Sequence, residues 1–107
     1  MPEFSNPFAG VAYGRKLTKE ELIRAIRYSV AAEYEAAQLY LQLSDSINDK
    51  VSKAVLEDIA EEELVHVGEF LRLLKYLAPK EEESYQKGYK EVEEMIKKVK
   101  GKKSYTS

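Results

Sequence analysis

The sequence contains a single histidine, His66, and the stretch EEELVHV (61–67) places Glu63 three positions before it. Residues three apart in an α-helix lie on one face, so a carboxylate and an imidazole here would point at one place. Carboxylate oxygens with an imidazole nitrogen suit iron, and they also accept Mn²⁺ or Zn²⁺. The spacing therefore makes a metal site possible, although a lone histidine on an apolar helix face is more often a packing residue.

A helix that begins at Thr18 is predicted to lie before this stretch. Thr18 is a good N-cap residue, and Glu21 three positions later completes a capping box. Apolar residues recur at helical spacing to about Leu43, after which the polar stretch SDSINDK (44–50) predicts a short turn. A second apolar helix follows, so the two helices are predicted to form an antiparallel hairpin.

The second helix carries Glu63 and His66, and Pro79 is expected to end it. A third helix is predicted over about residues 80–100, with glutamates at its start and lysines at its end, as the helix dipole favours. The fold class is therefore all-α. The predicted division of the chain is an N-terminal arm (1–17), a helical domain (18–100) and a C-terminal tail (101–107).

Each helix of the hairpin is expected to place a carboxylate among apolar residues. Glu33 falls on the line of Val30 and Ala37 in the first helix, and Glu63 and His66 share one line in the second. A buried carboxylate without a partner is costly, so these groups need a proton, a counter-charge or a metal. Lys and Arg are scarce on the inner faces, which favours a cation from outside.

The ligand pattern amounts to half of a known set. In di-iron carboxylate bundles two helices each provide a Glu and two others each provide Glu-x-x-His. This chain has one of each, and both hairpin helices are apolar over more than one stripe. A two-fold dimer would complete a four-helix bundle with four carboxylates and two imidazoles. The alternative is a metal-free dimeric helical scaffold in which His66 makes an interface hydrogen bond.

Composition excludes several other classes. The formal charge is −2, from 17 basic and 19 acidic residues, so nothing indicates a nucleic-acid partner. No apolar run approaches the ~20 residues of a membrane span, and we expect a soluble cytoplasmic protein. The chain has no cysteine, which excludes disulfides and thiolate metal sites. It also argues against a peroxide-reducing rubrerythrin, which would normally need a cysteine-bound iron domain.

The segments AAEYEAAQLYLQL (31–43) and DIAEEELVHVGEFLRLL (58–74) resemble those of the encapsulated ferritins, short ferritin-like proteins housed in encapsulin shells. The resemblance covers roughly residues 18–98. It implies a ferritin-like fold that works as two-fold dimers, arranged as a ring. It also implies ferroxidase activity, in which O₂ oxidises Fe²⁺ at a di-iron centre shared between two subunits. The partner would be an encapsulin shell protein, and the iron would be stored inside this nanocompartment in the cytoplasm.

The same resemblance implies roles for individual residues. Glu33, Glu63 and His66 correspond to the ferroxidase ligands, with Glu63 expected to bridge the two irons. Tyr40 corresponds to a tyrosine beside the centre, and Glu35 to an acidic position that binds metal on its way in.

Three features of the chain depart from the family pattern. Ala32 stands where the family often has another acid, and Leu39 stands where a tryptophan is common. The ending GKKSYTS (101–107) shows no evident shell-docking peptide. The chain is therefore expected either to be a piece of a fusion to the shell protein or to dock by another means.

Overall fold

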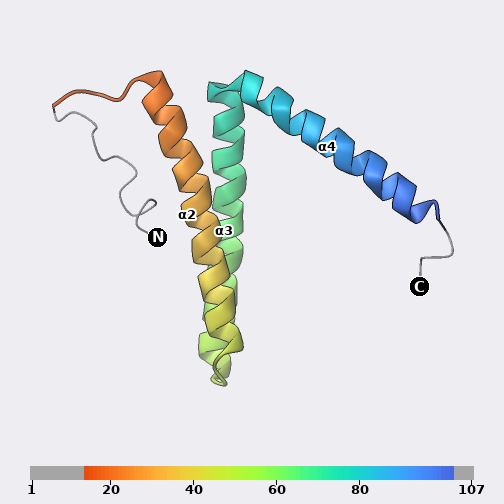
Figure 1. Ribbon diagram of the computed structural model, residues 1–107. Coiled ribbons are helices and arrows are strands. Elements are labelled where there is room, and N and C mark those ends of the chain that lie inside the picture. Colours follow the sequence, from red (N-terminus) through yellow and green to blue (C-terminus); the bar gives the residue numbers. More distant parts are fainter. Residues whose placement is uncertain (1–13, 103–107) are drawn as a thin grey trace. The chain divides into compact units, whose positions relative to one another are not determined.

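The computed structural model describes residues 14–102, which form three α-helices and no strand (Figure 1). The helices are α2 (Lys19–Asp45), α3 (Lys50–Leu77) and α4 (Pro79–Lys100). The predicted all-α class is confirmed. Most of the predicted arm and tail lies outside the described residues, so the division of the chain at 17 and 100 stays a prediction. Helices α2 and α3 belong to one compact unit and α4 belongs to another.

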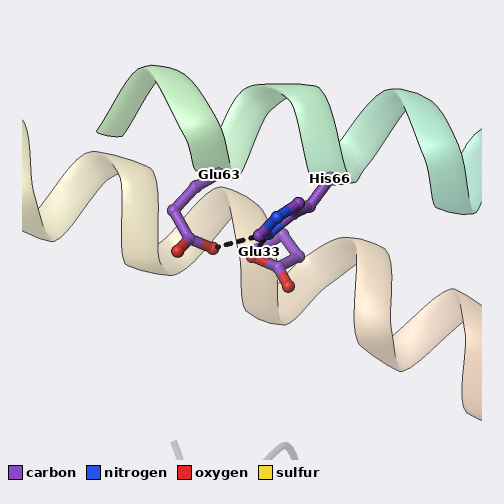
Figure 2. Close-up of side chains that lie close together, drawn as sticks. All are labelled: Glu33, Glu63 and His66. Atoms are coloured by element: carbon purple, nitrogen blue, oxygen red, sulfur yellow. Dashed lines mark ion pairs between the residues drawn. The ribbon is translucent and has the colours of Figure 1, made fainter. Parts of the chain in front are cut away.

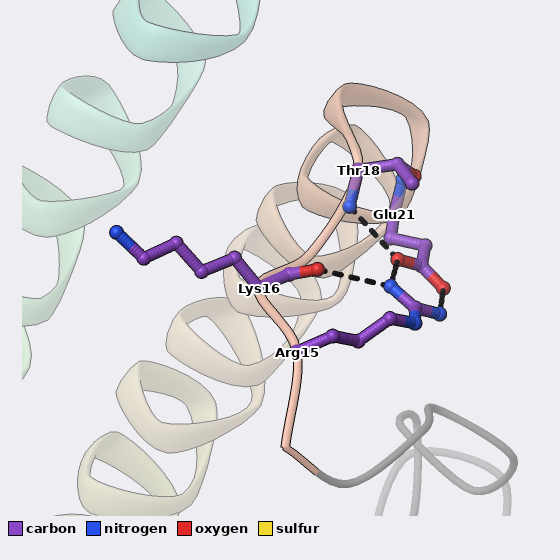
Figure 3. Close-up of polar contacts among 4 residues, drawn as sticks. All are labelled: Arg15, Lys16, Thr18 and Glu21. Atoms are coloured by element: carbon purple, nitrogen blue, oxygen red, sulfur yellow. Dashed lines mark hydrogen bonds and ion pairs between the residues drawn. The ribbon is translucent and has the colours of Figure 1, made fainter.

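Helix α2 begins with the predicted capping box. The backbone N–H of Glu21 donates to Oγ1 of Thr18 at 3.2 Å, and the N–H of Thr18 donates to Oε1 of Glu21 at 2.8 Å. These bonds satisfy backbone donors that the first turn of a helix leaves free. Arg15 adds a two-pronged ion pair, here called the fork, that the sequence does not predict. Its Nη1 and Nη2 donate to the two carboxylate oxygens of Glu21 at 2.8 Å each (Figure 3). Nη1 also donates to the carbonyl of Lys16 at 3.0 Å.

The turn of the hairpin is shorter than predicted, because α2 continues to Asp45 and α3 already begins at Lys50. Ser44 lies in the last turn of α2 and is 1% exposed. Its hydroxyl donates to a carboxylate oxygen of Glu57 at 2.8 Å, and its carbonyl accepts from the ammonium of Lys53 at 2.7 Å. Two side chains of α3 therefore hold the last turn of α2.

Asp49 lies just before α3, and its side chain bonds the first turn of that helix. Its carboxylate accepts from the backbone N–H of Ser52 at 2.9 Å and from the Ser52 hydroxyl at 2.6 Å. These two hydrogen bonds lower the pKa of Asp49, because they favour the ionised carboxylate. The hairpin is thus closed by side-chain bonds on both helices.

Helices α2 and α3 pack along each other as the predicted hairpin. Three of the six buried apolar residues of these helices are alanines, and the six are Ala25, Ile26, Ala37, Ala60, Val67 and Leu74. Alanine contacts let two helix backbones come close, towards the short end of the usual 8–10 Å between axes. Many larger apolar side chains of both helices stay exposed, so the hairpin by itself covers only part of its apolar surface.

Helix α4 begins at Pro79, one residue after α3 ends, with only Ala78 between the two helices. Pro79 therefore starts the third helix as well as following the second, as suits its fixed φ and missing N–H. Glutamates 81 and 82 lie in the first turn and three lysines in the last, as predicted from the helix dipole. Within the described part of the chain, no residue of α4 is buried and no helix is long and apolar enough to cross a membrane.

Candidate metal centre

The middle of the hairpin brings together three possible metal ligands from two helices. Glu33 comes from α2, and Glu63 and His66 come from successive turns of α3 (Figure 2). The Nδ1 atom of His66 lies 3.6 Å from Oε2 of Glu33 and 3.7 Å from Oε2 of Glu63. One ligand atom from each residue lies within 4.8 Å of the others. These distances suit three donors that surround one ion better than three groups that hydrogen-bond one another.

Helix geometry and close packing produce this meeting point. Glu63 and His66 are three residues apart and so share one face of α3. Ala37 lies one turn from Glu33, and Ala60 lies one turn from Glu63; both alanines are buried between the helices. Because these neighbours are small, the two carboxylates extend into the space between the helices and reach each other.

The carboxylates are more hidden than the imidazole. The exposed fraction of the side chain is 22% for Glu33, 18% for Glu63 and 47% for His66. Among the described residues, His66 is the one ion-pair partner of either carboxylate. Two close carboxylates with no Lys or Arg beside them repel each other unless a proton or a cation intervenes. The donor set is therefore suited to a cation, and its open side is the side of His66.

The donor types narrow the kind of cation. Two carboxylates with one imidazole suit iron, manganese or zinc, whereas thiolates, which soft metals prefer, are absent from the sequence. Three donors also leave coordination positions open on any of these ions. The residues present therefore fit an iron site, and they fit it as an incomplete set.

The structure separates the five predicted site residues into two groups. Glu33, Glu63 and His66 meet, whereas Glu35 is exposed on α2 and takes no part in the cluster. Tyr40 is half-buried on α2, seven residues after Glu33 and hence on nearly the same line. No hydrogen bond within residues 14–102 joins its hydroxyl to the cluster. The roles of all five residues in metal binding stay predictions.

Sequence reasoning missed the residues that hold the ends of the hairpin. Arg15 lies six residues before Glu21 in a segment without helical periodicity, so no spacing rule indicates the pair. Ser44 did carry a signal, because it lies seven residues after the buried Ala37 and therefore on the same line of the helix. Its polarity instead indicates the start of the predicted turn.

A hairpin with Glu on one helix and Glu-x-x-His on the other is typical of ferritin-like carboxylate proteins. Comparison with known families agrees with this class, because the rubrerythrin family model matches residues 25–106. The chain belongs to the rubrerythrin family. Its 107 residues contain no cysteine, so the match concerns the helical domain and no cysteine-bound iron.

Individual relatives point to one branch of ferritin-like proteins. The chain is 40% identical over 78 residues to the ferritin-like-encapsulin shell fusion protein of Pyrococcus furiosus. It is 36% identical over 81 residues to the encapsulin nanocompartment cargo protein EncC of Myxococcus xanthus. These matches cover 73% and 76% of this chain, but only 23% and 61% of the two relatives.

A solved structure gives the same result. The crystal structure of the encapsulated ferritin domain from Pyrococcus furiosus is similar with a TM-score of 0.75 and 36% identity. The similarity covers 80% of this chain and 88% of that domain. The resemblance to the encapsulated ferritins, and with it the ferritin-like fold, is confirmed.

Proposed function

We propose that this protein is a ferroxidase that oxidises Fe²⁺ with O₂ at a di-iron centre shared between two copies of the chain. One observation supports the proposal: Glu33, Glu63 and His66 meet in the hairpin with the imidazole as the most exposed of the three, and their types match half of the ligand set of di-iron carboxylate bundles. Iron is the substrate here, and the chain provides the place where two ions are held together.

A second copy would complete the site from the side of His66. Val55 and Leu73 lie eleven residues before and seven residues after His66, so all three share one line of α3. We call this line the site face. Val55 is 51% exposed and Leu73 is 38% exposed, so apolar surface that needs a partner flanks the imidazole. Two site faces related by a two-fold axis would bury these residues and bring four carboxylates and two imidazoles together.

Each ligand has a distinct task in this scheme. Glu63 would be the carboxylate shared by the two ions, Glu33 would be a terminal ligand, and the His66 of each copy would supply a nitrogen to one ion. Two Fe²⁺ ions held side by side can each give one electron to O₂, so that O₂ is reduced by an electron pair and no lone radical escapes. Tyr40 lies two turns after Glu33 on α2, and it would help to hold the ligands in position.

The names of the relatives supply the cellular setting. One is a fusion to an encapsulin shell and the other is an encapsulin cargo protein. We therefore propose that this chain acts inside an encapsulin nanocompartment in the cytoplasm, where the oxidised iron is stored. The shell protein would be its partner, together with further copies of the chain itself.

Anaerobic loading with Fe²⁺ tests the proposal. We expect two bound irons per dimer, followed by O₂ consumption in proportion to the iron oxidised when air is admitted. Glu20→Gln is the matched control, because it removes an exposed carboxylate near the start of the same helix that lies outside the cluster. A dimer that binds no iron, and oxidises Fe²⁺ no faster than buffer, would instead identify the chain as the metal-free scaffold.

A further inference from the structure

The first half of α2 carries a hollow that the proposed function does not use. Arg24, Arg27, Tyr28 and Ala31 line it, and its volume is about 410 Å³. Arg24 lies about 180° around the helix from Glu33, so this hollow faces away from the ligand cluster. The side chains of its wall therefore decide what it can bind.

The wall of the hollow is positively charged. Two guanidinium groups line it, and no carboxylate is among its lining residues in the described part of the chain. The stretch from residue 22 to residue 32 likewise contains two arginines and no acidic residue, in a chain whose net charge is −2. Positive charge is therefore concentrated here, against the overall balance of the chain.

The two acidic residues just before this stretch do little to neutralise it. Both carboxylate oxygens of Glu21 accept from Arg15 at 2.8 Å (Figure 3). Glu20 pairs with Arg24 at 4.0 Å, and the two side chains are 85% and 65% exposed. An exposed ion pair at this distance contributes little. Arg24 therefore keeps most of its capacity to bind an anion.

A neighbouring hollow shows which side of the two arginines suits an anion. It has a volume of about 330 Å³, and it shares both arginines with the first hollow. Its other lining residues are Glu20 and Ile23, and the carboxylate of Glu20 would repel an anion there. The first hollow has Tyr28 in its wall and no such carboxylate among the described residues. An anion is therefore favoured on the side of Tyr28.

The spacing of the three side chains suits a phosphate group. Arg24 and Arg27 are three residues apart and so are neighbours on the helix, where two like charges repel each other. An anion with two negative charges would relieve this repulsion. Guanidinium groups present planar pairs of donors that match phosphate oxygens. Tyr28 follows Arg24 by four residues and adds an aromatic ring on the same face.

We propose that Arg24 and Arg27, together with Tyr28, bind a phosphate group on the outer side of α2. The hollow has more room than the phosphate group alone needs. The group can therefore come from free phosphate or from a phosphate ester with a flat ring, such as a nucleotide. In the second case the ring would stack on Tyr28.

One consequence rests on the proposed function, although the binding itself does not. Iron that is oxidised at the shared centre needs anions in order to be stored as a solid, and phosphate oxygens are hard donors that suit Fe³⁺. Arg27 precedes Glu33 by six residues, which is about 9 Å along α2. The site would thus hold phosphate close to the place where Fe³⁺ is released. Because phosphate binding needs no iron, a failure of ferroxidase activity would leave the site standing.

Titration of the iron-free protein with inorganic phosphate tests the proposal. Calorimetry at low ionic strength should show saturable binding, and Arg24→Gln should weaken it at least about tenfold, as the loss of a charge-assisted hydrogen bond does. Arg72→Gln is the matched control, because it removes the same charge from an exposed arginine on α3. Arg24→Lys should bind with intermediate affinity, since lysine keeps the charge and lacks the planar donors. Equal weakening by Arg24→Gln and Arg72→Gln would overturn the proposal.

Adenosine monophosphate distinguishes the two sources of the phosphate group. If an ester fits the hollow, it should bind about tenfold more tightly than inorganic phosphate, and Tyr28→Leu should remove the difference because stacking is lost. Equal affinities of the two ligands for the wild type would identify free phosphate. Either result supports the site. The absence of saturable binding by both ligands would refute it, and so would a nucleotide that binds Arg24→Gln as tightly as the wild type.

Discussion

The imidazole of His66 on α3 lies 3.6 Å from a carboxylate oxygen of Glu33 on α2, so that two helices share one potential ligand cluster. This relationship exists only because the hairpin holds the middle of α2 against the middle of α3. Residues of the cluster can therefore be tested without disturbing the ends of either helix, where the capping bonds lie.

Replacing the carboxylates by amides should abolish most iron oxidation. Glu33→Gln and Glu63→Gln keep the shape of the side chain and remove its charge, so each should lower the oxidation rate at least about tenfold, as losses around metal ligands do. In the absence of metal the thermal midpoint should stay the same or rise, because the repulsion between two close carboxylates is relieved. Stopped-flow oxidation and calorimetry measure the two effects. A lower midpoint with unchanged oxidation would show that the carboxylates are structural.

His66→Ala should uncouple metal binding from assembly. If the ligands come from two copies, Fe²⁺ that binds the dimer better than the monomer must favour the dimer by the same free energy. We expect anaerobic Fe²⁺ to raise the dimer fraction of the wild type and to have little effect on the variant. Helix content should persist, because alanine is a good helix former. Equal shifts of both proteins in sedimentation equilibrium would identify His66 as a packing residue.

Glu35→Ala should change how fast iron arrives and not whether the site is filled. Glu35 is exposed and about 200° around α2 from Glu33, so it cannot join the cluster. We expect a slower uptake rate with two irons per dimer still bound at equilibrium. The measurement is uptake kinetics followed by metal analysis, and loss of bound iron at equilibrium would contradict this assignment.

Acid should weaken the start of α2 through Glu21. The Arg15 guanidinium, followed by the hydrogen bond from the Thr18 backbone, lowers the pKa of Glu21 to about 2. A carboxyl whose pKa is lower in the folded state stabilises the fold at pH values above its unfolded pKa, which is about 4.3 for Glu. This stabilisation is lost as the pH falls towards the folded pKa of about 2. Between pH 5 and 2 the thermal midpoint of the wild type should therefore fall more than that of Glu21→Gln. If the thermal midpoints of the two proteins, measured by circular dichroism, fall equally with pH, the Arg15–Glu21 ion pair adds no stability.

The hairpin and its cluster could be predicted because they depend on short-range regularities. Helical spacing places Glu63 beside His66, a capping box starts α2, and a short polar stretch forces the chain to turn back. The rest depends on contacts between distant residues. Ser44 is polar yet buried because it bonds Glu57 and Lys53 of α3, and no local preference indicates that partnership.

The small residues in the hairpin core have a consequence for which ions the cluster can accept. Ala37 and Ala60 set the distance between α2 and α3 beside the ligands, and both are almost fully buried, at 3% and 1% exposure. If the cluster binds metal as proposed, these two methyl groups would limit the space between its donors without touching the ion. Ca²⁺, which takes six to eight oxygens at about 2.3–2.6 Å, would suit a cluster of two carboxylates and a nitrogen donor poorly. Enlarging either alanine would widen the space while leaving every ligand in place.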